Sequence, residues 1–338
     1  MTSSTPVIHI VEPGHSCFTE IFRKLAPELK IRPIPLQDIF SICKPEDLGN
    51  PEEIEVLVCF PVFLLGLAKA GIHLPNLRWL HTLAAGLDKL KRYLEVSKSD
   101  SRFVLTWAPH INAAAVAEYV IGQILCSRRH FIEFYDQQRA AVWNRRSSQT
   151  ESLSGATVVV LGVGNIGLRV ARLCKAFEMT VHGVTRSAVT SGQGSPHVNV
   201  YWTSEEMEMA LAEADVIVSC LPSSQQTVSL LDNDRLQVCK EKKPVFINVG
   251  RGDLISEESV IKAIRSRWIS KAVLDVFSVE PLPADSPLWK EPNVIITPHV
   301  AMDCNTHTKS QIVRHFLDNY KRFVNNEPLM DFLDVRSI

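Results

Sequence analysis

The sequence predicts an α/β protein of two domains, both built on mainly parallel sheets. Three observations lead to this prediction. The chain has 338 residues, more than a single domain with one hydrophobic core usually contains. Short, continuous apolar runs alternate with helical patterns along it, as expected of parallel strands covered by helices on both faces. A glycine-rich turn at residues 162–167 lies between one such run and a helical pattern.

The part before this turn reads as a small parallel α/β unit. Its predicted strands are the apolar runs Val7–Val11, Glu55–Phe60, Leu77–Thr82 and Arg102–Thr106. Apolar residues at helical spacing then predict one long helix from Ala113 to about Tyr135. The polar, serine-rich residues 141–155 read as a connector into the next domain.

The part after the turn continues the same alternation. Four further strands are predicted over Val216–Leu221, Val245–Val249, Ala272–Phe277 and Val294–Thr297, with helical segments such as Glu257–Arg267 between them. The last helix, Thr306 to Val324, carries one apolar side and is expected to return to the N-terminal domain. We therefore expect a discontinuous domain, residues 1–106 and 300–338, and a second domain over residues 107–299.

Composition argues against several classes of protein. The net charge is −1 and the basic residues are scattered, so we expect no nucleic-acid partner. The most apolar stretch, Val56 to Ile72, is interrupted by Pro61, Gly66 and Lys69, so we expect no membrane span. Eight cysteines without a CxxC pair favour reduced thiols in a cytoplasmic protein.

No metal site is expected. The side chains of His307, Gln311 and His315 recur on one face of the last helix. The two histidines are two turns apart, too far to bind one ion together, and no carboxylate joins them at ligand spacing. We interpret these residues as belonging to the surface or to an interface.

The glycine turn predicts a dinucleotide site. It follows the apolar run Thr157–Leu161 and precedes a helix and a second run, Val181 to Val184, which is the βαβ context of a dinucleotide fingerprint. Its first glycine permits a tight turn, its second lets the backbone approach a pyrophosphate, and its third lets helix and strand pack closely. The alternative is a purely structural turn. The residues assigned to the coenzyme here are Gly162, Gly164, Asn165, Ile166 and Gly167.

The end of the second strand favours NADP over NAD. The acidic residue that binds the adenosine ribose in NAD-binding proteins is absent, since no carboxylate occurs between His182 and Pro196. The positions hold Thr185, Arg186 and Ser187 instead. A guanidinium flanked by two hydroxyls suits a 2′-phosphate. The alternative is an ordinary exposed arginine in a loop.

Three further fragments follow predicted strands, where open α/β sheets bind their ligands. They are Asn248–Gly252, Leu274–Pro283 and Thr297–Ala301. Each of their polar residues has a simple alternative: Arg251 in a surface turn, Glu280 as a loop carboxylate, His299 as a buried imidazole. Their placement after consecutive strands of one domain favours a shared active site.

At this point the chain resembles the D-isomer-specific 2-hydroxyacid dehydrogenases, and most of all their glyoxylate/hydroxypyruvate reductase-like branch. The resemblance rests on the loop Leu83–Asp88, the turn at 162–167, the segment Cys220-Leu221-Pro222 with Thr227, and the three fragments in family order. It implies a Rossmann-type dinucleotide-binding domain inserted in a discontinuous, flavodoxin-like α/β substrate-binding domain. It also implies a homodimer formed through the 113–135 helix and the connector with Trp143.

The resemblance assigns roles to these residues. His299 would be the proton donor, Glu280 its partner, and Arg251 the ligand of the substrate carboxylate, together with the backbone of Ala85 and Gly86. Asp275 would face the nicotinamide carboxamide, although the sequence leaves a helix-capping role open. Gly250 replaces the small side chain usual in the family. The remaining coenzyme contacts implied are Leu221, Pro222, Thr227, Val249, Gly250 and Ala301.

The sequence thus predicts an oxidoreductase that transfers a hydride from NADPH, in preference to NADH, to a small 2-oxo acid and forms the D-2-hydroxy acid. The alternative is a corepressor or scaffold protein on the same fold, in which nucleotide controls assembly. Relatives of that kind can keep all the catalytic residues. The short chain without extended polar tails argues against it.

Overall fold

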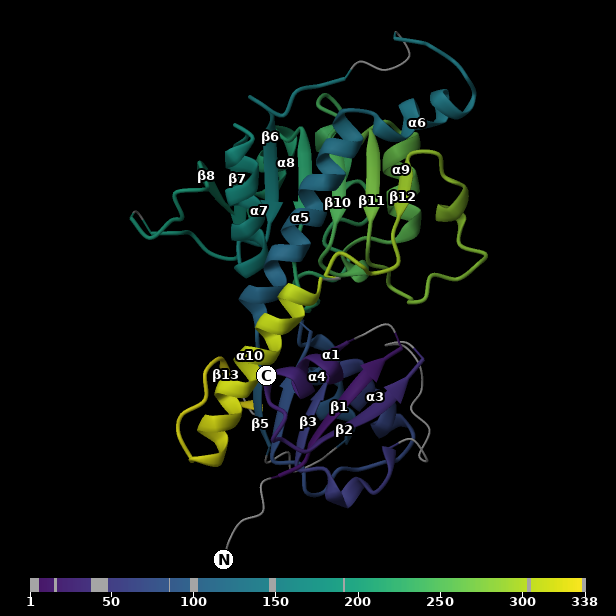
Figure 1. Ribbon diagram of the computed structural model, residues 1–338. Coiled ribbons are helices and arrows are strands. Elements are labelled where there is room, and N and C mark those ends of the chain that lie inside the picture. Colours follow the sequence, from purple (N-terminus) through teal and green to yellow (C-terminus); the bar gives the residue numbers. More distant parts are fainter. Residues whose placement is uncertain are drawn as a thin grey trace, which may run out of the picture. The chain divides into compact units, whose positions relative to one another are not determined.

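The computed structural model describes residues 6–14, 17–37, 48–84, 86–97, 103–145, 150–190, 192–302 and 305–335. The chain divides into two compact units (Figure 1). The first comprises Met1–Asn112 and Cys304–Ile338, and the second comprises Ala113–Asp303. The sequence places these boundaries at 106/107 and 299/300, a few residues earlier at both junctions.

The first unit contains a sheet of six strands in the order β13-β5-β4-β3-β1-β2. The order β2-β1-β3-β4-β5 is that of flavodoxin-like folds. All pairings are parallel except that of β13, which runs antiparallel to β5. The strands are β1 (Ile8–Pro13), β2 (Ile31–Leu36), β3 (Val56–Cys59), β4 (Trp79–Thr82), β5 (Val104–Trp107) and β13 (Phe332–Leu333).

Helices cover both faces of this sheet because its strands are apolar on both faces. Along β3, Val56 and Val58 pack in one cluster with Phe316, while Leu57 and Cys59 pack in the other. The first cluster lies under α1 (Phe18–Leu25) and α10 (Thr306–Val324), the second under α3 (Pro61–Lys69) and α4 (Asp88–Ser97). A short 3₁₀ turn, η1 (Pro51–Glu53), precedes β3.

The second unit contains a seven-stranded parallel sheet in the order β12-β11-β10-β9-β6-β7-β8. The order reverses between β6 and β9, which makes that point the topological switch of a dinucleotide-binding fold. The strands are β6 (Thr157–Leu161), β7 (Thr180–Thr185), β8 (Val200–Thr203), β9 (Val216–Ser219), β10 (Val245–Asn248), β11 (Lys271–Leu274) and β12 (Val294–Ile296).

Two apolar layers enclose this second sheet. Val158 and Val160 of β6 pack in the layer beneath α5 and α7, whereas Val159 and Leu161 pack in the layer beneath α8 and α9. The alternation follows from the two-residue period of a strand. The helices are α5 (Pro109–Arg128), whose first residues belong to the first unit, α6 (Phe131–Arg139), α7 (Asn165–Ala176), α8 (Met207–Ala212) and α9 (Glu257–Arg265), with 3₁₀ turns η2 (Arg235–Cys239), η3 (Gly252–Leu254) and η4 (Pro287–Lys290).

The predicted α/β class is confirmed, with two differences. The single helix expected from Ala113 to Tyr135 is two helices, α5 and α6, because His130 takes a left-handed conformation with φ of 55° between them. The strands β2, β8 and β13 were not predicted. β2 carries two prolines, and β8 has only four residues, none of which is buried. Within the described ranges, none of the helices has both the length and the apolar character needed to cross a bilayer.

Candidate active site

The predicted coenzyme and catalytic residues of the second unit lie at one edge of its sheet. They occupy the segments that follow β6, β7, β9, β10, β11 and β12. Because the strands are parallel, these segments all leave the sheet at its carboxyl edge. The turn after β6 and the loop after β9 lie on either side of the switch point, where such sheets bind nucleotides.

The glycine turn has the geometry that a pyrophosphate site requires. Gly162 has a φ of 89° and donates its N–H to the carbonyl of Val184 at 3.0 Å. A Cβ on Gly167 would collide with the carbonyl oxygen of Gly162, so only glycine lets α7 approach the turn. A Cβ on Gly164 would meet no heavy atom of the described residues within 4 Å. Since α7 begins at Asn165 without a side-chain cap, its first N–H groups remain available to an anion.

The end of β7 presents the predicted 2′-phosphate residues. Thr185 turns its hydroxyl inward, donating to the carbonyl of Ser187 at 2.9 Å. Arg186 and Ser187 are exposed. Among the described residues, none forms a hydrogen bond or ion pair with the Arg186 guanidinium. The backbone carbonyl of Arg186 accepts a hydrogen bond from the Ser204 hydroxyl at 3.3 Å. The arginine charge is therefore available to a ligand.

Several polar groups of the loop after β9 form hydrogen bonds to one another. The Thr227 hydroxyl donates to the carbonyl of Pro222 at 2.6 Å and accepts from the N–H of Ser224 at 2.8 Å. Thr227 thus shapes the loop, in addition to any contact with coenzyme. Leu221 packs beside Gly162, with its Cδ2 3.1 Å from the position of a Cβ there.

The turn that carries Arg251 is closed by Asn248. The Asn248 side chain accepts from the N–H of Gly250 at 3.1 Å and donates to the carbonyl of Arg251 at 2.9 Å. The Arg251 guanidinium donates to the carbonyl of Gly250 at 2.7 Å. A Cβ on Gly250 would overlap the backbone of Leu221. The departure from the family pattern at Gly250 is therefore required here by the close approach of the two loops. Val249 beside it is buried.

His299 and Glu280 form a pair. Nδ1 of His299 lies 2.9 Å from Oε2 of Glu280, and the other carboxylate oxygen accepts the N–H of Phe277 at 2.9 Å. The histidine side chain is about one-third exposed, at 34%, and the glutamate 17%. His299 has a left-handed backbone, with φ of 55°. The imidazole of His299 is thus partly exposed, and the Glu280 carboxylate binds it at Nδ1.

Asp275 is buried between β11 and the segment after β12. Its Oδ1 accepts the Thr297 hydroxyl at 2.6 Å and the N–H of Val300 at 2.9 Å, and its Oδ2 accepts the N–H of Ala301 at 3.0 Å. Its side chain is 1% exposed. The Asp275 carboxylate therefore binds the loop that follows β12, and not a helix terminus, which was the role that the sequence left open.

Two hydroxyl groups next to this carboxylate were given no role by the sequence. Thr297 donates to Asp275, and the Tyr119 hydroxyl lies 2.7 Å from the Thr297 hydroxyl. Tyr119 lies on α5 beside Ala117 and Val120 of the core. A phenol on an otherwise apolar helix face needs a buried partner, and this signal could have identified it.

The predicted substrate loop belongs to the first unit. It follows β4, and the carbonyl of Leu83 in it accepts from the Asn112 side chain at 3.1 Å. Gly86 is partly exposed there. Ala85, the other predicted ligand, lies outside the described residues.

The two histidines of α10 differ in exposure. His307 is exposed, as predicted, and contacts Gln311 at 3.2 Å. His315 is not a surface residue, since its side chain is 12% exposed and its Nε2 lies 2.8 Å from Asp331, which His110 also approaches at 3.2 Å. Helical spacing alone did not show that α10 buries this position against the C-terminal segment.

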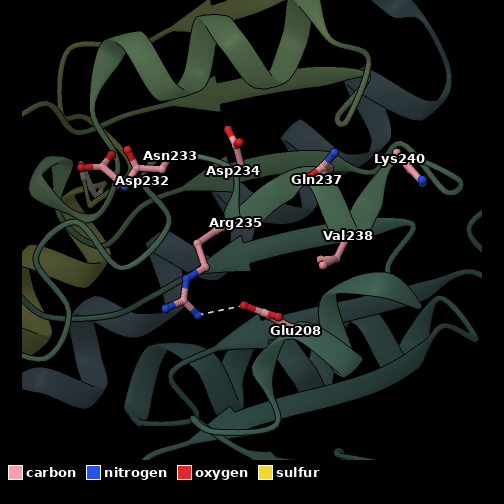
Figure 2. Close-up of a pocket in the computed structure, with 8 residues that line it drawn as sticks. All are labelled: Glu208, Asp232, Asn233, Asp234, Arg235, Gln237, Val238 and Lys240. Carbon is pink, nitrogen blue, oxygen red and sulfur yellow. Dashed lines mark hydrogen bonds and ion pairs between the residues drawn. The ribbon is translucent and has the colours of Figure 1, made fainter.

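A cleft elsewhere on the second unit is lined mostly by charged and polar residues (Figure 2). They are Glu208, Asp232, Asn233, Asp234, Arg235, Gln237, Val238 and Lys240. Glu208 and Arg235 pair across it at 3.0 Å. These residues lie on α8, on η2 and directly beside η2, in the segments that precede β9 and β10, so the cleft is not part of the carboxyl-edge site.

Comparison with known proteins agrees with the geometry. Residues 121–301 match the family described as D-isomer specific 2-hydroxyacid dehydrogenase, NAD binding domain. A glyoxylate reductase from Thermofilum pendens is 27% identical over 299 residues, covering 86% of this chain and 83% of that protein.

Two solved structures are similar over nearly the whole chain. A D-isomer specific 2-hydroxyacid dehydrogenase family protein from Aeromonas salmonicida is 29% identical with a TM-score of 0.79, covering 98% of this chain and 100% of the other. A D-isomer specific 2-hydroxyacid dehydrogenase from Xanthobacter autotrophicus, in complex with NADPH and MES, is 25% identical with a TM-score of 0.76 and covers 99% of each chain. This chain belongs to the D-isomer specific 2-hydroxyacid dehydrogenase family and is an enzyme that interconverts 2-oxo and 2-hydroxy acids with a nicotinamide coenzyme.

Proposed function

We propose that the enzyme uses NADPH to reduce a small 2-oxo acid of the glyoxylate or hydroxypyruvate kind to the D-2-hydroxy acid. The observation that carries the proposal is the His299–Glu280 pair, at 2.9 Å, on the same sheet edge as the glycine turn and Arg251. The reductase name of the relative from Thermofilum pendens supports the substrate class.

The residues of the carboxyl edge fit a dinucleotide. The room beside Gly164 and the uncapped start of α7 suit a pyrophosphate, and bound NADPH supplies the hydride. We assign the coenzyme contacts to the glycine turn, to Thr185–Ser187, to the loop of Leu221, Pro222 and Thr227, and to Val249, Gly250, Asp275 and Ala301. Asp275 has one carboxylate oxygen with a single donor among the described residues, which leaves capacity for an amide.

His299 is the proposed proton donor to the carbonyl oxygen. Because Nδ1 faces Glu280, Nε2 is the atom free to face a substrate. In the imidazolium form both ring nitrogens are donors, so Nδ1 can donate to Glu280 while Nε2 donates to the substrate. The bond from the N–H of Phe277 fixes the carboxylate itself, so the imidazole plane is set by the fold.

Arg251 is the proposed ligand of the substrate carboxylate. A planar guanidinium binds a carboxylate with two parallel hydrogen bonds. The closed turn around Asn248 sets the direction in which this side chain leaves the backbone. The backbone N–H groups of Ala85 and Gly86 complete the proposed substrate ligands.

A panel of 2-oxo acids assayed with NADPH and NADH tests the function. We expect loss of NADPH absorbance with glyoxylate or hydroxypyruvate at about one turnover per second or faster. Chiral chromatography of the product should show the D-isomer. NADPH binding without turnover of any 2-oxo acid would contradict the proposal and favour the scaffold alternative.

Coenzyme preference rests on Arg186, whose charge is available to a ligand. We expect Arg186→Ala to raise the KM for NADPH about tenfold or more, because a charge-assisted phosphate contact contributes on the order of 1.5–3 kcal/mol. The KM for NADH should change little. Arg235→Ala is the matched control, since that exposed arginine pairs with Glu208 at the other cleft. A wild-type preference for NADH would refute the assignment.

We further propose that the enzyme is a homodimer formed through α5, α6 and the connector. Phe131, Ile132 and Tyr135 of α6 are exposed by 40–58%, and Trp143 is 92% exposed. A two-fold pair is the commonest soluble assembly. Sedimentation at micromolar concentration should give a dimer, and Tyr135→Glu should shift it toward monomer. Free thiols at the described cysteines support a cytoplasmic location, which cell fractionation would test.

A further inference from the structure

A chain of hydrogen bonds leads from α5 to the segment that carries His299. The Tyr119 hydroxyl lies 2.7 Å from the Thr297 hydroxyl, which lies 2.6 Å from Oδ1 of Asp275. All three residues belong to the second unit.

The chemistry of the groups sets the direction of this chain. A carboxylate only accepts, so the Thr297 hydroxyl must donate its single proton to Asp275. The Tyr119 hydroxyl must then donate to Thr297. Burial raises the pKa of Tyr119 to about 12, and the charge of Asp275 acts in the same direction, so the phenol keeps the proton that this bond needs.

The same carboxylate holds the backbone on the far side of His299. It accepts the N–H groups of Val300 and Ala301 at 2.9 and 3.0 Å. His299 therefore lies between two points of attachment to Asp275, Thr297 before it and Val300 after it. The N–H of His299 also closes onto the carbonyl of Thr297 at 3.0 Å.

This attachment explains how His299 keeps its left-handed backbone. A φ of 55° is an unfavourable backbone conformation for a residue with a side chain. Glu280 restrains the imidazole, whereas Asp275 and its donors restrain the backbone from which the imidazole projects. Loss of either restraint would move Nε2 relative to a bound carbonyl.

We propose that Thr297 and Tyr119 are positioning residues that act through Asp275 to hold His299 at its working angle. The inference rests on the proposed function, because it assigns these residues to the proton-transfer geometry of that site. It predicts a larger effect on kcat than on coenzyme binding, since neither hydroxyl lies on the glycine turn or at the end of β7, although Asp275 is also a proposed coenzyme contact.

Three variants separate this role from a general contribution to stability. Thr297→Val removes the hydroxyl and keeps the shape, Thr297→Ser restores the hydroxyl, and Tyr119→Phe removes only the outer donor. We expect kcat to fall about tenfold to a hundredfold in Thr297→Val, because a displacement on the order of 1 Å can have that effect. Tyr119→Phe should lose about threefold, and Thr297→Ser should stay within about twofold of wild type.

The controls are the melting temperature and the NADPH dissociation constant, followed by protein fluorescence. We expect NADPH affinity to fall less than kcat in all three variants, because Asp275 is also a proposed coenzyme contact while the proposed pyrophosphate and 2′-phosphate contacts are untouched. A normal kcat and an unchanged pH profile in Thr297→Val would overturn the inference. So would an equal loss of kcat in Thr297→Ser, because the hydroxyl would then not be the cause.

A readout without turnover separates this inference from the proposed function. Protein with isotope-labelled histidines gives an imidazole NMR signal for His299. This signal is assigned because it disappears in His299→Gln. We expect this signal and its pH titration to change in Thr297→Val and to return in Thr297→Ser. Such a result in an enzyme inactive on every 2-oxo acid would refute the function and keep the positioning role. Active wild type with an unperturbed His299 signal in Thr297→Val would do the reverse.

Discussion

At the scale of single residues, the proposed proton donor His299 is held by more than one partner. Its ring is bonded to Glu280 at 2.9 Å, while its backbone lies between bonds to Asp275. Both carboxylates come from the segment that follows β11, so one piece of chain sets two properties of one histidine. Replacements of His299 or Glu280 should therefore alter proton transfer without altering the coenzyme site.

His299→Gln removes the proposed proton donor and keeps a side chain of similar length. We expect turnover to fall by about a hundredfold or more, the usual contribution of a general acid. The NADPH dissociation constant should be unchanged, because the glycine turn and the end of β7 are untouched. Stopped-flow reduction and equilibrium binding check the two parts. Near-normal turnover would overturn the mechanism.

Glu280→Gln should do less damage than His299→Gln, because the amide oxygen can still accept a hydrogen bond from Nδ1 of His299 while the charge is lost. A hydrogen bond to a charged acceptor is stronger than one to a neutral acceptor. We therefore expect kcat to fall, with the NADPH dissociation constant unchanged. Stopped-flow reduction and equilibrium binding measure this. A wild-type kcat would mean that the charge at the 2.9 Å contact has no role in the reaction.

At the scale of elements, the glycine-rich segment 162–167, which joins β6 to α7, contains two glycines that are needed for different physical reasons. At Gly167 a Cβ would collide with the carbonyl oxygen of Gly162. At Gly164 a Cβ would meet no described atom within 4 Å, and its φ of −93° suits any residue. Glycine at 167 allows α7 to pack against the turn, and glycine at 164 allows a ligand to approach the backbone.

Matched alanine substitutions separate these two reasons. Gly167→Ala should lower the melting temperature by several degrees, about 2–4 °C per kcal/mol in a chain of this size, and weaken NADPH binding as well. Gly164→Ala should keep the melting temperature and still weaken NADPH, because the methyl group occupies space needed by the pyrophosphate. Calorimetry with and without NADPH distinguishes them. Unchanged affinity in Gly164→Ala would contradict the assigned pyrophosphate position.

At the scale of the whole molecule, we expect the pH dependence of stability to involve a histidine outside the proposed catalytic pair. His81 on β4 is fully buried, with Nδ1 2.8 Å from the Thr106 hydroxyl. Burial, with a smaller effect of His315, lowers its pKa from 6.5 to about 3. The unfolded chain therefore binds a proton at a pH where the folded chain does not, and acid favours unfolding.

We expect the free energy of unfolding to decrease as pH falls from about 6.5 toward 3. The contribution of His81 should reach about 1.4 kcal/mol per pH unit within that window. His81→Gln should be less stable at neutral pH and lose less on acidification. Urea unfolding at several pH values measures both slopes. Equal slopes would show that His81 is not the group responsible.

The sequence by itself determined the class of the fold, the order of the site motifs and the family. Parallel strands buried on both faces must be continuously apolar, as in Thr157–Leu161. The glycine turn and the three polar fragments are local, so their spacing in the chain identified them. The last helix, predicted over Thr306 to Val324, has the same bounds in the structure.

Only the tertiary structure decided which groups meet. Tyr119 and Thr297 are separated by 178 positions, yet their hydroxyls lie 2.7 Å apart. The need for glycine at 250 also depends on a distant segment, because the backbone of Leu221 leaves no room for a Cβ there. Hydrogen bonds and steric overlap act across space, whereas periodicity reports only what one segment buries. The positioning of His299 therefore became visible only when β11, β12 and α5 were placed side by side.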